Sequence, residues 1–336
     1  MRVYRFATTG GIDDLTLAEA ERPKPGRGQV LVRMRAASLN YRDLSVAKGK
    51  YRLSSIPPDL IPLSDGAGEV VEAGPEVTRF KRGDRVAGIF MQGWIGGEIT
   101  VEDRATALGG AIDGVLAEYR LFDQQGLVPL PDHLSFEEGA SLPCAAVTAW
   151  NALYGAKPLQ AGETVLVLGT GGVSIFALQF AHAAGARVIA TSSSDEKLQR
   201  ARDLGAAEGV NYRRHPDWEA EVRRLTGGRG VDHVVEVGGA GTLPRSIASC
   251  RLGGWVHLIG VLSGGQMDPT MIMGAGVTVR GIYVGSRQMF EAMNRAIELH
   301  RLRPVIDTVF PFDRAHDAYR HLESAAHVGK VVIRID

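Results

Sequence analysis

Short runs in which apolar residues alternate with polar ones dominate the first 128 residues. In the segment 29–37 every even-numbered residue is apolar, whereas Arg33 and Arg35 fall on the opposite face of an extended chain. This period of two predicts a half-buried β-strand. Turn signals rich in Gly and Pro separate the runs, and further strands are predicted at 68–72, 84–87 and 115–121. The pattern indicates a compact, mostly antiparallel β domain.

From about residue 160 the pattern changes to strands that alternate with helices. An apolar strand at 164–168 precedes apolar residues at helical spacing between Val173 and Ala184, and Asp195 is the predicted N-cap of a helix at 195–204. Such alternation predicts an α/β fold, in which helices cover both faces of a parallel sheet. Further strands are predicted at 187–191, 210–212, 231–237, 255–259 and 277–284, a helix at 287–300 and a last strand at 330–335.

The balance of charge indicates which kinds of binding partner are not expected. The 336 residues include 38 Lys and Arg and 38 Asp and Glu, so the formal net charge is zero. Nucleic-acid binders and proteins of membrane surfaces rely on a basic excess, and neither kind of partner is expected here. The uncharged run 164–186 is divided by Gly169, Gly171 and Gly172 into a strand and a helix, so it is not a membrane span. The N-terminus has no signal-peptide pattern, and a cytoplasmic protein is expected.

A glycine-rich turn connects the first strand of the second half to its helix. It reads Gly169-Thr170-Gly171-Gly172-Val173-Ser174. Gly169 permits a tight turn, and the next two glycines let the backbone approach a pyrophosphate in front of the helix N-terminus. Ser174 replaces the third glycine of the usual pattern but is small enough for close packing. The turn is predicted to bind a dinucleotide through residues 169–173, in preference to an ordinary βα turn.

The end of the second strand of this half favours NADPH over NADH. Ser192 stands 23 residues after Gly169, where sites for NAD usually carry Asp or Glu to bind the ribose hydroxyls. With Ser192 and Ser193 in that place, no carboxylate repels a 2′-phosphate. Lys197, Arg213 and Arg214 offer positive charge, although Lys197 is also explained as a solvated residue, and Tyr212 is placed to contact the adenine. NADH remains possible.

Several separate segments in the right order carry a resemblance to a known family. They are the glycine-rich turn and the segments 66–71 (GAGEVV), 80–86 (FKRGDRV), 117–119 (AEY) and 329–332 (GKVV). The chain is similar over its full length to the medium-chain dehydrogenase/reductase superfamily. The resemblance implies a GroES-like catalytic domain at 1–128 and 285–336, and a Rossmann domain with a six-stranded parallel sheet at 129–284. It also implies a substrate cleft between the domains and a homodimer that pairs the last Rossmann strand.

The zinc ligands of the alcohol dehydrogenases of this superfamily are largely absent. By the resemblance, Asn40 stands in the place of the first Cys ligand, and Ser64-Asp65 replaces a His-Glu pair. Only Cys144 matches a ligand, whereas a catalytic zinc needs three protein ligands. The segment 92–121, which would hold a structural zinc, contains no Cys. No metal site is therefore predicted, and Cys144 is interpreted as a buried small hydrophobic residue.

Without a metal, an acceptor that spreads charge by conjugation is the easier substrate. Zinc-free members similar to this chain are mostly quinone oxidoreductases and 2-alkenal or enoyl reductases. The resemblance implies that Asn40 hydrogen-bonds the substrate carbonyl or the nicotinamide ribose, and that Tyr51 is the proton donor, although Tyr51 is equally explained as a loop residue that covers apolar surface. Arg42 replaces the hydroxyl residue of the proton relay. Residues implied to contact the nicotinamide are Thr148, Gly260, Val261 and Leu262.

Three functions remain open at this point. The first is an NADPH-dependent, zinc-independent reductase of a quinone or an α,β-unsaturated carbonyl compound. The second is a zinc-free NAD(P)-dependent alcohol dehydrogenase. The third is a non-catalytic binding protein, against which the intact glycine-rich turn and Asn40 weigh.

Overall fold

The computed structural model describes residues 1–51, 55–260 and 262–336 of the chain, and these form two compact units. The first comprises Met1–Val147 and Gly285–Asp336, and the second comprises Thr148–Val284. The sequence analysis began the second domain at residue 129. In the structure, residues 129–147 belong to the first unit, because the helix α3 (Phe136–Ala140) in this stretch packs against strands of that unit.

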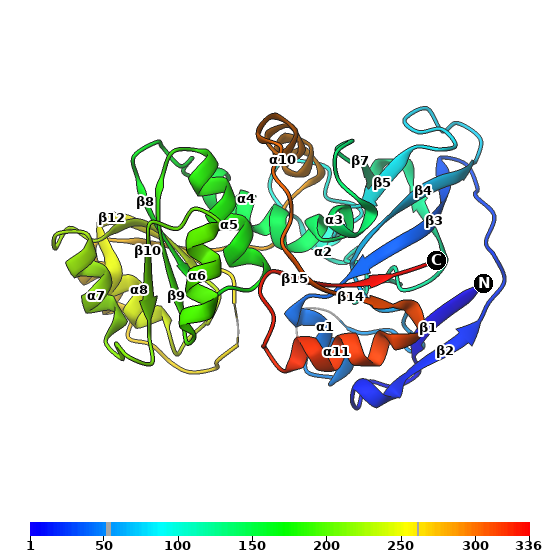
Figure 1. Ribbon diagram of the computed structural model, residues 1–336. Coiled ribbons are helices and arrows are strands. Elements are labelled where there is room, and N and C mark those ends of the chain that lie inside the picture. The colour runs from blue at the N-terminus through cyan, green and yellow to red at the C-terminus, as the bar shows by residue number, and fades with distance from the viewer. Residues whose placement is uncertain (52–54, 261) are drawn as a thin grey trace. The chain divides into compact units, whose positions relative to one another are not determined.

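The second unit is built on a six-stranded parallel sheet, as the alternating pattern predicts. Its strands run in the order β10-β9-β8-β11-β12-β13. In Figure 1, α5 and α6 lie on one side of this sheet and α7 and α8 on the other. The strands are β8 (Thr164–Leu168), β9 (Arg187–Ser192), β10 (Glu208–Asn211), β11 (Val231–Glu236), β12 (Cys250–Leu258) and β13 (Thr278–Gly281). The helices are α4 (Val147–Tyr154), α5 (Gly172–Ala183), α6 (Asp195–Asp203), α7 (Trp218–Leu225), α8 (Leu243–Ser249) and α9 (Thr270–Ala275).

Burial on both faces explains the continuous apolar character of the central strands. All five residues of β8 are buried, since helices cover the sheet on either side. Several predicted boundaries differ from the structure, and β12, which begins at Cys250 rather than at 255, differs most. Ser194, not Asp195, caps α6 by accepting a hydrogen bond from Lys197 N, and β10 ends at Asn211, so that Tyr212 follows the strand. The last strand is shorter than the predicted 277–284.

The first unit is built on a mostly antiparallel seven-stranded sheet. Its order is β14-β15-β3-β4-β5-β7, with β6 also paired to β3, and β14 and β15 are parallel neighbours. The strands are β3 (Gln29–Ser38), β4 (Asp65–Ala73), β5 (Arg85–Gly88), β6 (Tyr119–Asp123), β7 (Leu127–Pro129), β14 (Ile306–Pro311) and β15 (Lys330–Arg334), beside a β1 (Arg2–Phe6) and β2 (Leu15–Glu19) pair. The helices are α1 (Tyr41–Ala47), α2 (Val101–Arg104), α3, α10 (Arg287–His300), α11 (Ala315–Glu323) and a π-helical turn at Leu142–Ala146.

Alternation accounts for β3, whose even-numbered residues enter the core of this unit. Val32 and Met34 pack there with Phe122 of β6 and Tyr319 of α11. The predicted strand at 115–121 is wrong in its first part: β6 begins at Tyr119, and Ala117 makes only an isolated bridge.

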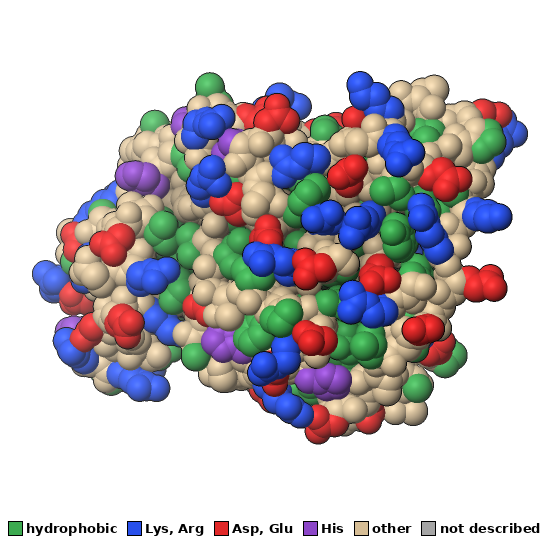
Figure 2. Space-filling view, turned by 45° about the vertical axis from the view of Figure 1, so that its right-hand side comes forward, with side chains coloured by type: hydrophobic (Ala, Val, Ile, Leu, Met, Phe, Trp, Pro, Cys, Tyr) green, Lys and Arg blue, Asp and Glu red, His purple; other side chains and the backbone are tan. Residues whose placement is uncertain are grey.

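The surface carries both signs of charge, and Figure 2 shows Lys and Arg side chains interspersed with Asp and Glu over the face in view. Across the described ranges, no helix combines the length and the apolar character needed to span a membrane.

Candidate active site

Asn40 is fixed where the longest strand of the first unit gives way to a helix. β3 ends at Ser38, and Asn40 is the extended residue that precedes α1. Its backbone N–H donates to Oδ2 of Asp43 at 2.7 Å. Acidic residues are stabilised in the first turn of a helix, so this contact ties the start of α1 to the strand end.

The side chain of Asn40 is held by Lys330, the first residue of β15. The Lys330 ammonium donates to Oδ1 of Asn40 at 2.6 Å and to the carbonyl oxygen of Leu39 at 2.6 Å. It also lies 3.9 Å from Oδ2 of Asp65, the first residue of β4, and it is only 3% exposed. A lysine is almost never buried to this degree without partners. Here the segment that follows β3 and the first residue of β4 supply them.

Asp65 connects this cation to two further positions. Its Oδ1 accepts from the Ser64 hydroxyl at 2.7 Å, and its Oδ2 accepts from the backbone N–H of Cys144 at 3.1 Å. Cys144 is half-buried rather than fully buried as predicted. Burial, and then the charge of Asp65, raise the pKa of the Cys144 thiol, so the thiol stays protonated. Asn40, Ser64, Asp65, Cys144 and Lys330 are called the Lys330 cluster below.

The Lys330 cluster does not provide a zinc site. Its donors are an amide, a hydroxyl, one carboxylate and one thiol whose pKa is raised, whereas zinc takes thiolates, imidazoles and carboxylates. The amide oxygen and the carboxylate already face the Lys330 ammonium. Over the whole of the described chain, no group of three or more His, Cys, Asp or Glu side chains could hold a metal ion.

One polar group of the Lys330 cluster lacks a hydrogen-bond partner among the described residues. Nδ2 of Asn40 is buried and has no hydrogen-bond partner within the described residues. A buried donor without an acceptor costs about 1–3 kcal/mol. A ligand that brings an oxygen atom to this group would remove that cost.

Arg42 and Tyr51 lie together beside the start of α1. The guanidinium carbon of Arg42 lies 4.9 Å from the ring centre of Tyr51 and 4.5 Å from that of Phe90. The guanidinium donates to the carbonyl oxygen of Leu108 at 2.7 Å. Arg42 is therefore committed to two rings and a backbone oxygen, which places its positive charge next to the Tyr51 phenol.

Asp43 adds a titratable group to the same unit. Its Oδ1 is buried and has no partner within the described ranges. Burial raises the pKa of Asp43 to about 6, against the opposing effect of the Arg42 charge. Asp43 therefore changes its charge close to neutral pH.

The glycine-rich turn of the second unit has the geometry that a dinucleotide requires. Gly169 has φ +70°, which favours glycine, and a Cβ added at Gly171 would meet no atom within 4 Å. Gly171 precedes α5 without a side-chain cap, so the first N–H groups of the helix are available to a pyrophosphate. Ser174 is buried and donates to the carbonyl oxygen of Leu168 at 2.6 Å, which explains why it replaces glycine. Thr170 is buried, and Gly172 and Val173 are half-buried in the first turn of α5.

The ends of β9 and β10 agree with the absence of a ribose-binding carboxylate. Ser192 is the last residue of β9 and is buried, and Ser193 follows half-buried. The nearby Asp195 accepts from Nδ2 of Asn211 at 2.8 Å and pairs with Arg214. Lys197 lies in the first turn of α6, and Tyr212 is 42% exposed.

A buried carboxylate organises the loops that follow β11 and β12. Glu236 accepts hydrogen bonds from Gly238 N, Gly239 N and the hydroxyls of Thr242 and Ser246. Gly260 cannot carry a side chain, because its Cβ would lie 1.6 Å from the carbonyl oxygen of Val237.

Three other residues were predicted to contact the nicotinamide, and the structure describes two of them. Leu262 is exposed, and Thr148 is buried in the first turn of α4. Val261 lies outside the described residues.

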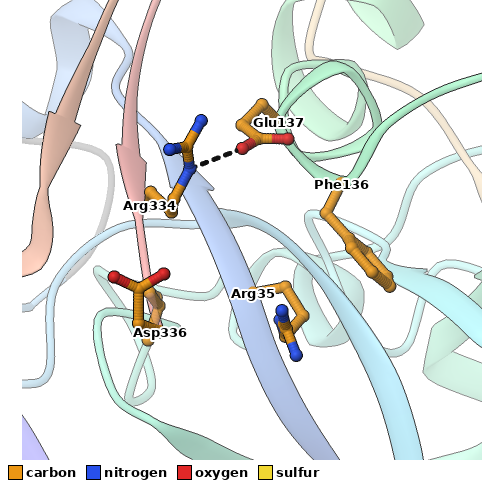
Figure 3. Close-up of a pocket in the computed structure, with 6 residues that line it drawn as sticks. Arg35, Phe136, Glu137, Arg334 and Asp336 are labelled. Atoms are coloured by element: carbon orange, nitrogen blue, oxygen red, sulfur yellow. Dashed lines mark hydrogen bonds and ion pairs between the residues drawn. The ribbon is translucent and has the colours of Figure 1, made fainter.

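Sequence reasoning did not identify Lys330, Asp65 or Glu236 as functional residues. A lysine that opens an otherwise apolar strand (KVVIR) was the available signal for Lys330. A shallow pocket elsewhere in the first unit is lined by Arg35, Phe136, Glu137 and Arg334 (Figure 3). Arg334 pairs with Glu137 at 2.8 Å, and the guanidinium carbon of Arg35 lies 5.8 Å from the ring centre of Phe136, so these groups are occupied with one another.

The two units, with their glycine-rich turn and their buried polar cluster, define a nicotinamide-dependent dehydrogenase. The family model of the alcohol dehydrogenase GroES-like domain matches residues 26–132, and that of the zinc-binding dehydrogenases matches residues 172–298. The chain belongs to the medium-chain dehydrogenase/reductase superfamily. It is an NAD(P)H-dependent oxidoreductase of the alcohol dehydrogenase and quinone oxidoreductase type.

Individual relatives cover nearly the whole chain. A zinc-type alcohol dehydrogenase-like protein of Schizosaccharomyces pombe is 47% identical over 97% of this chain and 96% of its own. A quinone oxidoreductase of Sus scrofa is 29% identical over 99% of this chain and 96% of its own. A solved NAD-dependent alcohol dehydrogenase is 36% identical, with a TM-score of 0.91 and 100% of both chains covered.

Proposed function

We propose that the protein is a zinc-independent, NADPH-dependent reductase of a quinone or an α,β-unsaturated carbonyl compound. The observation that carries this proposal is the composition of the Lys330 cluster. It offers a buried amide donor at Asn40 and a lysine cation, but not the three ligands of a catalytic zinc. NADPH, when bound by the glycine-rich turn, supplies a hydride; the chain's own residues must then stabilise charge on the acceptor.

Conjugation explains why hydrogen-bond donors suffice for such acceptors. Reduction of an isolated ketone concentrates negative charge on one oxygen, which zinc ordinarily stabilises. In a quinone or enone the charge spreads over several atoms, and one oriented donor contributes substantially to its stabilisation. The Asn40 amide is such a donor, held in place by the Lys330 ammonium.

Tyr51 is the proton donor in this proposal. Its half-buried phenol lies against the Arg42 guanidinium, whose positive charge stabilises the phenolate that remains after proton transfer. Arg42 acts on Tyr51 and does not itself give up a proton, because a guanidinium stays charged in proteins.

The cofactor preference rests on Ser192 and Ser193. Neither residue carries a charge that would repel a 2′-phosphate, and Asp195 is already paired with Arg214. One similar structure is that of an NAD-dependent alcohol dehydrogenase, and the assay below measures the preference of this chain with both cofactors.

The test is a panel of quinones, 2-alkenals and simple alcohols, each assayed with both cofactors. We expect kcat/KM to be largest for NADPH with a quinone or an alkenal. Turnover confined to alcohols and ketones would favour a zinc-free alcohol dehydrogenase instead. Absence of NADPH-dependent quenching of tryptophan fluorescence would favour a non-catalytic protein.

The substrate assays are accompanied by a test for bound metal. Elemental analysis of freshly purified protein and turnover after dialysis against a chelator are measured together. Activity should survive chelation. Stoichiometric zinc, with activity lost on chelation and restored by zinc, would overturn the proposal.

The chain is further proposed to form a homodimer. Among the described residues, β13 has a neighbouring strand on one side only, so its other edge is offered to the same strand of a second copy. Light scattering coupled to size-exclusion chromatography gives the mass in solution, and a monomer would contradict this assignment.

A further inference from the structure

We infer that Lys330 is a positioning residue, which orients the Asn40 amide so that only a hydrogen-bond donor is presented to the ligand. The inference rests on the proposed function, in which Asn40 contacts the ligand, and it narrows the ligand group to an oxygen acceptor. That oxygen belongs to the carbonyl or quinone substrate or to the nicotinamide ribose. The same Asn40 group serves either source, and the experiment below separates them.

The orientation of the amide follows from the chemistry of its partner. An ammonium group has three N–H donors and no acceptor. The Asn40 atom 2.6 Å from Nζ of Lys330 must therefore be the carbonyl oxygen Oδ1. Nδ2 then points away from the lysine, where it has no partner in the described chain. An amide rotated by 180° would place two donors against each other.

Lys330 is itself fixed by the rest of its cluster. One N–H goes to the carbonyl oxygen of Leu39, and the carboxylate of Asp65 faces the same ammonium. Asp65 is held in turn by the Ser64 hydroxyl and the Cys144 backbone. The ammonium is 3% exposed, so neither water nor an alternative rotamer replaces these contacts readily.

A donor-only amide has a consequence for ligand choice. A carbonyl or quinone oxygen accepts its hydrogen bond and does so more strongly as negative charge develops during reduction. A hydroxyl that offers its proton finds no acceptor on Asn40, because Oδ1 is already used by Lys330. Lys330 thereby makes Asn40 a donor to a bound oxygen and excludes its amide as the acceptor of a ligand proton.

A double-mutant cycle tests this role directly. Lys330→Met removes the ammonium, Asn40→Ala removes the amide, and the double variant combines both. Asn40→Asp keeps an oxygen for Lys330, replaces the donor by a second oxygen and adds a negative charge beside the ammonium. Lys157→Met is the matched control, since Lys157 is also an ion-paired lysine, 2.7 Å from Glu163, in the other unit. Each variant is measured for kcat/KM of the best acceptor, for the NADPH dissociation constant and for thermal stability.

We expect Lys330→Met to lower kcat/KM about 10- to 100-fold in the presence of Asn40, and less than threefold in the Asn40→Ala background. Asn40→Asp should lower it about 100-fold with little change in melting temperature. If the oxygen is that of the ribose, the NADPH dissociation constant rises instead, with the same lack of additivity. Lys157→Met should change neither quantity.

Additive losses in the cycle, or Lys330→Met without effect, would overturn the positioning role. If Lys330→Met does not fold, Asn40→Asp decides: more than a third of the wild-type kcat/KM, with an unchanged NADPH dissociation constant, would overturn it. A wild-type protein that reduces no acceptor refutes the proposed reductase. In that case the cycle is read on NADPH binding alone, where no response to Asn40→Asp would overturn the positioning role as well.

Discussion

Two buried clusters of ionisable side chains, one in each unit, can be compared by the polar atom that each leaves without a partner among the described residues: Nδ2 of Asn40 in the first and Nδ1 of His257 in the second. The Lys330 cluster lies at the ends of β3, β4 and β15 in the first unit. In the second unit, His233 of β11 lies between His257 of β12, with the ring nitrogens 3.0 Å apart, and Glu163, 3.1 Å from its Nε2. Glu163, His233 and His257 are called the histidine cluster.

The two rings of the histidine cluster lie within β11 and β12, and Glu163 is the residue before β8. His233 and His257 are fully buried, their rings stack at 5.3 Å, and the Trp255 ring stacks on His257. Burial, and then the neighbouring His233, lower the pKa of His257 to about 3, so this ring is neutral at ordinary pH. The Lys330 cluster instead contains a cation and directs one free amide donor away from it.

The contrast between the two clusters indicates where in a fold buried polar groups take part in function. Polar groups at strand ends adjoin loops, where ligands bind, whereas polar groups within a central sheet are reached only by their neighbours. The Lys330 cluster should therefore govern turnover as well as stability, and the histidine cluster stability alone.

The largest expected effect is a loss of stability when the counter-charge of Lys330 is removed. Asp65→Ala leaves a buried ammonium without its carboxylate and removes the acceptor of Ser64 and Cys144. Breaking a buried pair in this way costs about 3–5 kcal/mol, measured as the free energy of unfolding in urea at pH 7. Glu163→Ala is the counterpart in the histidine cluster. It should cost less, about 1–3 kcal/mol, because its partner Lys157 is 27% exposed while Nε2 of the buried His233 loses its partner. Equal losses would contradict the contrast between the two clusters.

The second effect is a dependence of stability on pH that arises in the histidine cluster. The pKa of His257 is about 3 when folded and 6.5 as the ordinary value, so between these values only the unfolded chain binds the proton. Stability is therefore complete above pH 6.5 and falls as the pH is lowered toward 3, by about 1.4 kcal/mol per unit. Between pH 7 and pH 5 the loss from His257 is about 2 kcal/mol.

His257→Leu removes this contribution, whereas the neighbouring His233, whose pKa burial also lowers, keeps titrating with the same sign. Asp43 titrates with the opposite sign: its folded pKa is raised to about 6, so it stabilises the protein at low pH and that contribution is lost as the pH rises through 6. The difference between wild type and His257→Leu, from urea unfolding at pH 7 and pH 5, leaves Asp43 unchanged. The variant should lose less stability on acidification and keep its kcat/KM. A parallel pH response in both proteins would show that His257 does not titrate as described.

These two regions were not equally predictable from the sequence. The alternation of strands and helices in the second unit followed from patterning, because β8 is a continuous apolar run and α5 has apolar residues at helical spacing. The glycine-rich turn was also predictable, because its residues are contiguous in the sequence and lie between a strand and a helix. His233 and His257 interrupt apolar strands at positions 24 residues apart, and only the parallel register of β11 and β12 brings them together.

The Lys330 cluster could not be assembled from local patterns. Asn40 was identified by resemblance, but its partner Lys330 is 290 residues away along the chain. The contact exists because β15 pairs antiparallel with β3 in the sheet. A lysine at a strand start is ordinarily solvated, so its burial depended on a register that the sequence alone does not specify.

The third expected effect is a loss of turnover with no change in stability. Tyr51→Phe removes the phenol oxygen but keeps the ring that packs 4.9 Å from the Arg42 guanidinium carbon. We expect kcat/KM for an enone to fall about 20-fold, equivalent to about 1.8 kcal/mol, with an unchanged melting temperature. Tyr154→Phe, which alters a tyrosine whose ring centre lies 4.3 Å from that of Trp150 in the second unit, is the control and should leave kcat/KM unchanged. A Tyr51→Phe variant with wild-type turnover would assign the proton to water instead.

The smallest expected effect changes cofactor choice in the second unit without touching the histidine cluster. Ser192→Asp restores a carboxylate at the end of β9, where it would repel a 2′-phosphate and accept from ribose hydroxyls. Ser192 Oγ accepts from Ser194 N at 3.3 Å, and an aspartate oxygen can keep that contact. The ratio of kcat/KM for NADPH to that for NADH should fall about tenfold, close to 1.4 kcal/mol. Ser193→Asp, one residue beyond the strand, is the matched control and should move the ratio less. If both variants shift it equally, the preference arises from overall charge near Lys197 and Arg214 rather than from the strand end.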